Sequence, residues 1–174
     1  MESKTKLVGH PIHPMLIPFP LGLLSTALVF DAIHLLTRSR QPALVSFWTL
    51  AAGIVGGLLA APFGLVDWLA VPPGTRAKRI GLLHGSGNLV VVALAALSWI
   101  LRLGRPHQPS AAALAASAAG VSLAVVTGWL GGELVDRLGV GVDPGAHLNA
   151  PSSLTGKPAV GAVEPESAEP TPAS

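Results

Sequence analysis

Four long apolar runs divide the chain, and each is followed by a more polar stretch rich in Pro, Gly, Lys or Arg. The runs cover residues 15–36, 47–69, 80–101 and 111–135. Because an α-helix rises about 1.5 Å per residue, each run is long enough to cross the roughly 30 Å hydrocarbon layer of a bilayer. Short connections place consecutive helices antiparallel. The pattern predicts an all-α membrane protein with four transmembrane helices in an antiparallel bundle.

The same pattern divides the chain into three parts. Residues 1–14 form an N-terminal segment that contains HPIHP, residues 15–143 form the transmembrane domain, and residues 144–174 form a tail. The tail is rich in Pro, Ala, Ser, Gly and Glu, so it cannot bury enough apolar surface to fold, and we expect it to be disordered. Within the domain, Ser110 is placed as the N-cap of the fourth helix, and Pro62 is expected to bend the second.

Composition agrees with a membrane environment. Hydrophobic residues make up 50% of the chain and charged residues 11%, and the mean hydropathy is +0.58. An ordinary soluble domain is about one quarter charged, so a soluble chain of this composition could not cover its surface with polar groups. The absence of Cys excludes disulfides, thiolate metal sites and thiol nucleophiles. The net charge of +2 comes from Lys and Arg between apolar runs and does not indicate nucleic-acid binding.

The distribution of Lys and Arg indicates an orientation. Positive charges near the ends of transmembrane helices favour the cytoplasmic side. One side carries Lys4, Lys6, Arg76, Lys78, Arg79 and Arg137, and the other carries Arg38, Arg40, Arg102 and Arg105. We therefore expect a multi-pass protein of the cell (inner) membrane with both termini in the cytoplasm.

Two of the runs carry small residues at a spacing of about four. The second contains Gly53, Gly57, Ala60 and Gly64, followed by Asp67, and the fourth contains Ala116, Gly120, Ala124, Gly128 and Gly132. Such stripes lie on one helix face and allow close helix approach in lipid. We interpret them as packing surfaces.

Imidazole and carboxylate groups are predicted to meet at one level of the bundle. Antiparallel threading puts His13, Asp67, His84 and Glu133 on the same side, and the last three lie roughly 12–17 Å from the centres of their spans. Ionisable residues within spans are costly and often pair or mark a functional site. Because imidazole and carboxylate suit Fe and Zn, we expect these four residues to bind a metal ion, with His10 and Asn88 in support.

Two alternatives to this metal site stay open. The same groups can lie at the level of the lipid headgroups, where Trp68 and Trp129 would mark the interface. A haem held between His13 and His84 is less favoured, because His13 is expected in a Pro-bracketed turn instead of a regular helix.

The opposite side has its own polar pair in the first span. Asp31 and His34 share one helix face. Asp31 is the deepest carboxylate, and we expect it to form a salt bridge with Arg38 or Arg102.

Four sequence blocks together resemble a known family. They are GHPIHPMLIPFPLGL at 9–23, FGLVDW at 63–68, HGSGN at 84–88 and GWLGGELVDRLGVGV at 128–142. Over residues 8–143 the chain resembles the bacterial predicted membrane proteins grouped as domain of unknown function 2231. The resemblance implies a four-helix membrane fold without an established activity. Its motif positions fall on His10, His13, Asp67, His84 and Glu133, while Asp136 departs from the aromatic residue expected there.

Three functions remain open. The first is a redox- or metal-associated membrane subunit. Relatives fused to or encoded beside Rieske-type iron–sulfur or other redox modules would fit such a role and a redox protein partner. The second is a structural or assembly subunit, and self-association is compatible with either. The third, a proton or small-solute permease using Asp31 and His34, is less favoured because no inverted repeat is evident. No catalytic motif is present, and HGSGN lacks the strand-flanked turn of a serine hydrolase, so we do not expect an enzyme on its own.

Overall fold

The computed structural model describes residues 1–160, which are mostly helical. The α-helices are α1 (Ile12–Leu16), α2 (Pro18–Thr37), α3 (Arg40–Ala70), α4 (Arg76–Ile100) and α5 (Ala111–Gly132). A π-helical turn, η1 (Glu133–Arg137), extends α5, and a 3₁₀ turn, η2 (Ser153–Thr155), lies near the end of the described part. A small antiparallel hairpin of β1 (Lys6–Leu7) and β2 (His10–Pro11) precedes α1. Residues 161–174, part of the predicted tail, lie outside the described residues.

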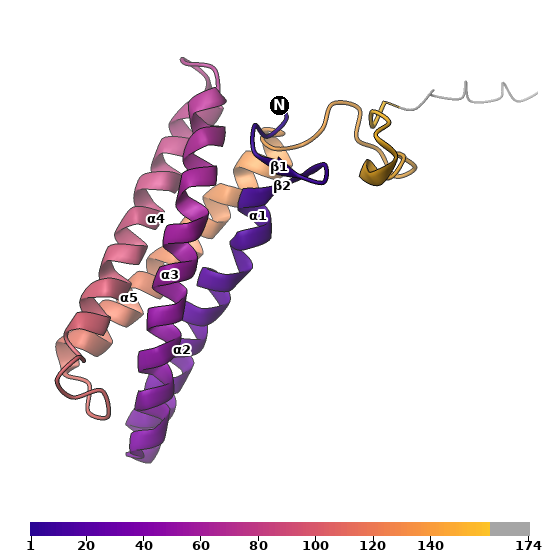
Figure 1. The fold of residues 1–174 in the computed structure, drawn as a ribbon. Coiled ribbons are helices and arrows are strands. Elements are labelled where there is room, and N and C mark those ends of the chain that lie inside the picture. Colours follow the sequence, from indigo (N-terminus) through magenta and orange to yellow (C-terminus); the bar gives the residue numbers. More distant parts are fainter. Residues whose placement is uncertain (161–174) are drawn as a thin grey trace, which may run out of the picture.

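The helices form an elongated antiparallel bundle of two hairpins, α1–α3 and α4–α5 (Figure 1). Four segments are long and apolar enough to cross a membrane, namely Ile12–Thr37, Arg40–Ala70, Arg76–Ile100 and Ala111–Arg137. The predicted fold class, with four helices long and apolar enough to cross a membrane, is therefore confirmed.

Proline explains where the observed helices differ from the predicted ones. His13 was expected in a turn, and this was wrong, since it lies in α1. Pro14 is the third residue of that helix, where proline is tolerated because the first N–H groups of a helix lack intrahelical partners. Pro18 then begins α2 in the same way. The second span differs for another reason. Its helix begins at Arg40, before the predicted residue 47, because the first turn is helical but polar and therefore lies outside the apolar run.

Side chains cap the helix ends near both connections of α4. The Ser110 hydroxyl accepts the N–H of Ala113 at 3.2 Å, which confirms it as the N-cap of α5. Thr75 caps α4 in the same way. At the turn from α3 to α4, the Trp68 indole donates to the Lys78 carbonyl at 3.1 Å. The Lys78 ammonium donates to the Trp68 carbonyl at 2.7 Å and lies 4.0 Å from the indole centroid. These contacts fasten α3 to α4 at this end.

Glycines of α3 let neighbouring helices approach closely around a small apolar core. The core consists of Leu24, Ala27, Leu50, Val91, Ala95 and Ala124. A Cβ at Gly57 of α3 would lie 2.9 Å from Val92 of α4, and a Cβ at Gly53 would lie 2.7 Å from Leu24. The small-residue stripe of α3 is thus used for helix packing, as predicted, and at these two positions the packing is within the chain. On α5, by contrast, Gly128 faces open space.

A buried ion pair joins the two hairpins at one end of the bundle. Arg102, which is 0% exposed, donates to both carboxylate oxygens of Asp31 at 2.7 Å. Ser46 of α3 and Ser98 of α4 each accept a further bond from the guanidinium at 3.0 Å. Ser98 in turn donates to the Ala113 carbonyl of α5 at 2.7 Å. The predicted salt bridge of Asp31 is confirmed with Arg102 as its partner, and it ties all four spans together.

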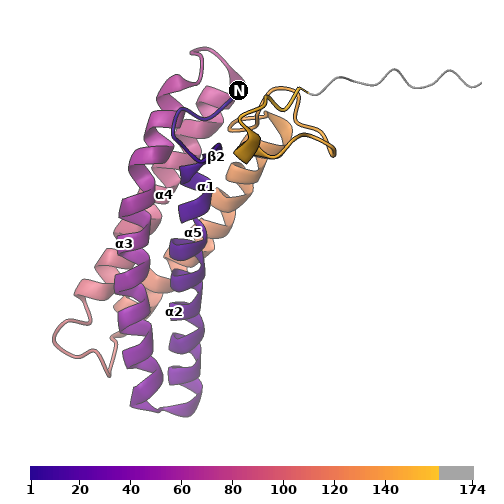
Figure 2. The same ribbon diagram turned by 45° about the vertical axis from the view of Figure 1, so that its right-hand side comes forward.

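The other end bears a structure that we call the cap, formed by residues 1–11 and residues 138–160 (Figure 2). The two parts of the cap are hydrogen-bonded to each other. The bonds are Met1 amino group to Gly139 carbonyl (2.8 Å), Gly141 N–H to Met1 carbonyl (2.8 Å), Lys6 ammonium to Asp143 carboxylate, and Ser153 hydroxyl with His10 imidazole (3.2 Å). The chain segments before α1 and after α5 therefore meet at this end.

Candidate functional site

His84 of α4 lies in a closed ring of hydrogen bonds between α4 and α5. Its Nδ1 is 2.8 Å from the carbonyl oxygen of Thr127, and its Nε2 is 3.1 Å from Nδ2 of Asn88, one turn further along α4. The Thr127 hydroxyl closes the ring by donating to Oδ1 of Asn88 at 2.8 Å. Thr127 is 2% exposed, and the other two side chains are partly buried.

The donors and acceptors of this ring can be assigned from chemistry. A carbonyl oxygen only accepts, so the hydrogen between His84 and Thr127 belongs to His84 Nδ1. Nε2 of the neutral imidazole is then an acceptor and takes a hydrogen from the Asn88 amide nitrogen. This leaves the Asn88 oxygen to accept from Thr127. The ring therefore holds neutral His84 as its Nδ1–H tautomer.

His13 of α1 is held in a similar way by the other hairpin. Its Nδ1 lies 3.0 Å from the carbonyl oxygen of Ala60 of α3. A Cβ at Gly64 would lie 2.7 Å from the His13 ring, so only glycine leaves room for the imidazole there. Gly131 plays the same part for His84, since its Cβ would lie 3.0 Å from that ring. In both cases the imidazole donates to a carbonyl and packs over the glycine four residues later.

Asp67 is occupied by the cap. The hydroxyl of Ser3 lies 2.8 Å from both carboxylate oxygens, and the backbone N–H of Lys4 donates to one of them at 2.7 Å. Ser3 is 6% exposed although it is near the N-terminus. Asp67 therefore anchors the N-terminal segment to the end of α3.

Glu133 and His10 also have partners of their own. Glu133 accepts a hydrogen bond from Arg76 at 2.6 Å, which links η1 to the start of α4. His10 is exposed in β2 and lies beside Ser153. The predicted metal ligands thus lie toward one end of the chain's bundle, but they are divided among separate contacts. Within residues 1–160 there is no group of three or more His, Asp or Glu side chains placed to hold one metal ion.

Sequence reasoning found His84 and its neighbour Asn88 but missed Thr127. Asn88 is detectable because it lies four residues after His84 and so shares its helix face. Thr127 gives no comparable signal, because it is one of several small residues on α5. Its role depends on the helix register between α4 and α5, which only the folded structure shows.

Comparison with known proteins gives a family and no closer relative. No curated protein and no solved structure matches the chain. Residues 9–144 match the family described as Predicted membrane protein (DUF2231), and this match includes all four spans and all of the predicted motif residues. The chain therefore belongs to this family of predicted membrane proteins.

Proposed function

We propose that this integral membrane protein takes up and releases a proton at His84, and that Asn88 and Thr127 stabilise both protonation states. The observation that carries the proposal is the closed hydrogen-bond ring of these three residues. A histidine can change its charge between about pH 5 and 8, so it is the side chain best suited to this role.

The ring has a second arrangement that fits protonated His84. When a proton from water binds to Nε2, that atom becomes a donor and can no longer accept from Asn88. A half-turn of the Asn88 amide presents its oxygen to Nε2–H and its nitrogen to the Thr127 hydroxyl. Thr127 can then donate to the Ala124 carbonyl, which already lies 3.2 Å from its hydroxyl oxygen. Every polar atom of the ring remains hydrogen-bonded in both states, which limits the cost of charging an imidazole away from bulk water.

Few other charges act on this ring. Glu133 beyond α5 is paired with Arg76, and Asp67 on α3 is held by the cap. Both carboxylates therefore have partners outside the His84 ring.

Nuclear magnetic resonance of ¹⁵N-histidine in lipid bilayers tests the proposal. The His84 resonances, identified by their loss in a His84→Gln variant, should show the Nδ1–H tautomer at high pH and the doubly protonated form at low pH. Asn88→Leu keeps the volume but removes the amide, so the charged fraction of His84 at a given pH should fall. Ser86→Ala, on the exposed face of the same helix, is the matched control. A His84 signal that stays unchanged between about pH 5 and 8 would refute the proposal.

The redox- or metal-associated role predicted from the sequence is a separate proposal with its own test. It requires Asp67 and Glu133 to leave Ser3 and Arg76. Metal analysis and an absorption spectrum of the purified protein decide it, and a folded, colourless, metal-free preparation would count against it. We further propose a redox protein partner, self-association and a cytoplasmic location of the cap.

The structure weakens the two other functions considered from the sequence. Asp31 is bound by Arg102 and is not a free polar step for a permease. The stripe of α3 packs within the chain at Gly53 and Gly57, which leaves less of it for contacts in an assembly.

A further inference from the structure

The two hairpins are connected differently at the two ends of the bundle. At the Arg102 end, each hairpin has its own covalent turn, and Arg102 joins the hairpins to each other. At the capped end, residues 71–75 connect α3 to α4, but no turn connects α1 to α5. We call the boundary between α1 and α5 at this end the seam. Because the chain does not close the seam, noncovalent contacts must do so.

The hydrogen bonds across the seam lie in the cap. Lys6 before α1 binds Asp143 beyond η1, and Met1 exchanges backbone bonds with Gly139 and Gly141. By contrast, the hydrogen bonds of the membrane-embedded histidines stay within one hairpin, from His13 to α3 and from His84 to α5. The other side-chain hydrogen bonds between the hairpins in residues 1–160 are those of Arg102 at the opposite end and those of Trp68 and Lys78, which join α3 to α4 and do not cross the seam.

We infer that the cap is a latch on the seam, and that its release lets α1 and α5 separate at the histidine end while Arg102 holds the other end. His13 lies on one side of the seam, and the Thr127 carbonyl that holds His84 lies on the other. Opening the seam therefore exposes the His84 ring to water from the capped side. This consequence for His84 rests on the proposed proton site, whereas the opening itself does not.

The chemistry of the latch suits reversible opening. The Lys6 and Asp143 side chains are 24% and 39% exposed, so water and salt can replace their contact. The pKa of Lys6 is raised from its ordinary value, mainly by its hydrogen bond to Asp143, so the ammonium remains charged at neutral pH. Salt or a change of charge, and not loss of the lysine proton, is then what opens the latch under neutral conditions.

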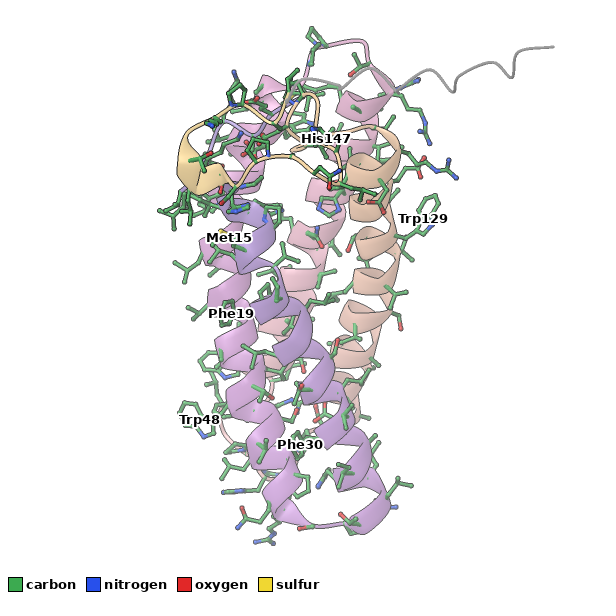
Figure 3. All side chains as sticks on the ribbon, turned by 90° about the vertical axis from the view of Figure 1, so that its right-hand side faces the viewer. Met15, Phe19, Phe30, Trp48, Trp129 and His147 are labelled. Carbon is green, nitrogen blue, oxygen red and sulfur yellow. The ribbon has the colours of Figure 1, made fainter. Side chains whose placement is uncertain are left out.

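Distances between spin labels measure the opening directly, and the chain is well suited to this because it contains no Cys. One pair of labels, at Met15 on α1 and Val126 on α5, reports on the seam. Both sites face outward, and Figure 3 places Met15 on the far side of the bundle from Trp129, an α5 neighbour of Val126. A second pair, at Leu36 and Ala112, reports on the Arg102 end.

The charge variant Lys6→Glu places three carboxylates together and should open the latch, because Glu2 and Asp143 both contact Lys6. The Met15–Val126 distances should then extend beyond the wild-type distribution, while the Leu36–Ala112 distances should not. Adding Asp143→Lys restores an opposite-charge pair and should return the distances to wild type. Arg79→Glu, the same type of charge reversal at an exposed site of α4 toward the same end of the bundle, is the matched control.

Two results would overturn the latch. One is an unchanged seam distance in Lys6→Glu, and the other is an equal change at both ends, which would indicate general loosening. The proton proposal is judged separately by the His84 resonances of the same variants. If the seam opens while His84 remains unaffected by pH, the latch stands and the proton site fails.

Discussion

Replacing Arg102 with Met is expected to be among the most destabilising single changes in this chain. The substitution keeps an unbranched side chain of similar length but removes every hydrogen bond of the guanidinium. Asp31, which is 2% exposed, would then be a buried carboxylate without its counter-ion. Ser46 would lose its hydrogen-bond donor at the same time.

The magnitude follows from the burial of the pair. Removing one partner of a buried ion pair costs about 3–5 kcal/mol, because the remaining charge stays in a medium of low dielectric constant. One kcal/mol shifts the melting temperature of a chain of this size by about 2–4 °C. Arg102→Met should therefore lower the melting temperature by about 6–20 °C. Thermal unfolding in detergent, followed by circular dichroism, measures the shift.

Two further variants separate the ion pair from other effects. Arg105→Met removes an exposed arginine from the same connection and should change stability by less than about 0.5 kcal/mol. The double variant Asp31→Leu/Arg102→Met leaves no buried charge, so it should be clearly more stable than Arg102→Met alone. A single variant that loses less than about 1 kcal/mol, or a double variant that loses the sum of both single effects, would refute this account of the pair.

Two smaller predictions concern the capped end. Gly64→Ala should destabilise the protein by about 1–3 kcal/mol in the same unfolding assay, because its Cβ would lie 2.7 Å from the His13 ring. Gly85→Ala, in open space on α4, should instead stabilise it by about 0.5–1 kcal/mol, and similar effects at both sites would contradict the close fit of His13. Because the folded-state pKa of Lys6 is raised, its contribution is complete below the ordinary value of 10.5 and is lost as the pH rises through the folded-state pKa. As the pH is raised, the seam distances should therefore lengthen at such alkaline pH, and a Lys6→Met variant should lack that transition.

The spans and the ion pair could be predicted because their signals are local or strong. Hydropathy and length identify a transmembrane helix without reference to its neighbours. A carboxylate as deep as Asp31 needs a counter-ion, and few arginines lie at its level, so Arg102 was among the expected partners. The start of α3 at Arg40 was missed because polar residues at a helix end give no hydropathy signal.

The shared metal site was predicted from the depth of its residues in the membrane. Depth alone does not determine whether their side chains meet. Residues at one level of a bundle meet only if their helix faces point toward each other, and rotation about the helix axis is set by packing. Gly64 and Gly131 each receive an imidazole from a helix of their own hairpin, which directs His13 and His84 to separate carbonyls. Asp67 accepts a hydrogen bond from the backbone N–H of Lys4, which lies outside the spans and was therefore not considered as a partner. The carboxylates and imidazoles consequently share a level without sharing a contact.

The two polar layers of the bundle differ in their capacity to change charge. The terminal nitrogens of Arg102 are fully bonded to Asp31, Ser46 and Ser98, and no rearrangement keeps those bonds while changing the charge. That layer can hold the hairpins together but has a single state. The ring of His84 and Asn88, by contrast, contains an amide that can present either a donor or an acceptor, so it can gain a proton without leaving a polar atom unpaired. It also lies toward the end where the hairpins are joined by exposed contacts. The proposed proton site and the proposed opening therefore coincide at the capped end, and the buried ion pair at the opposite end is suited to act as the hinge of that opening.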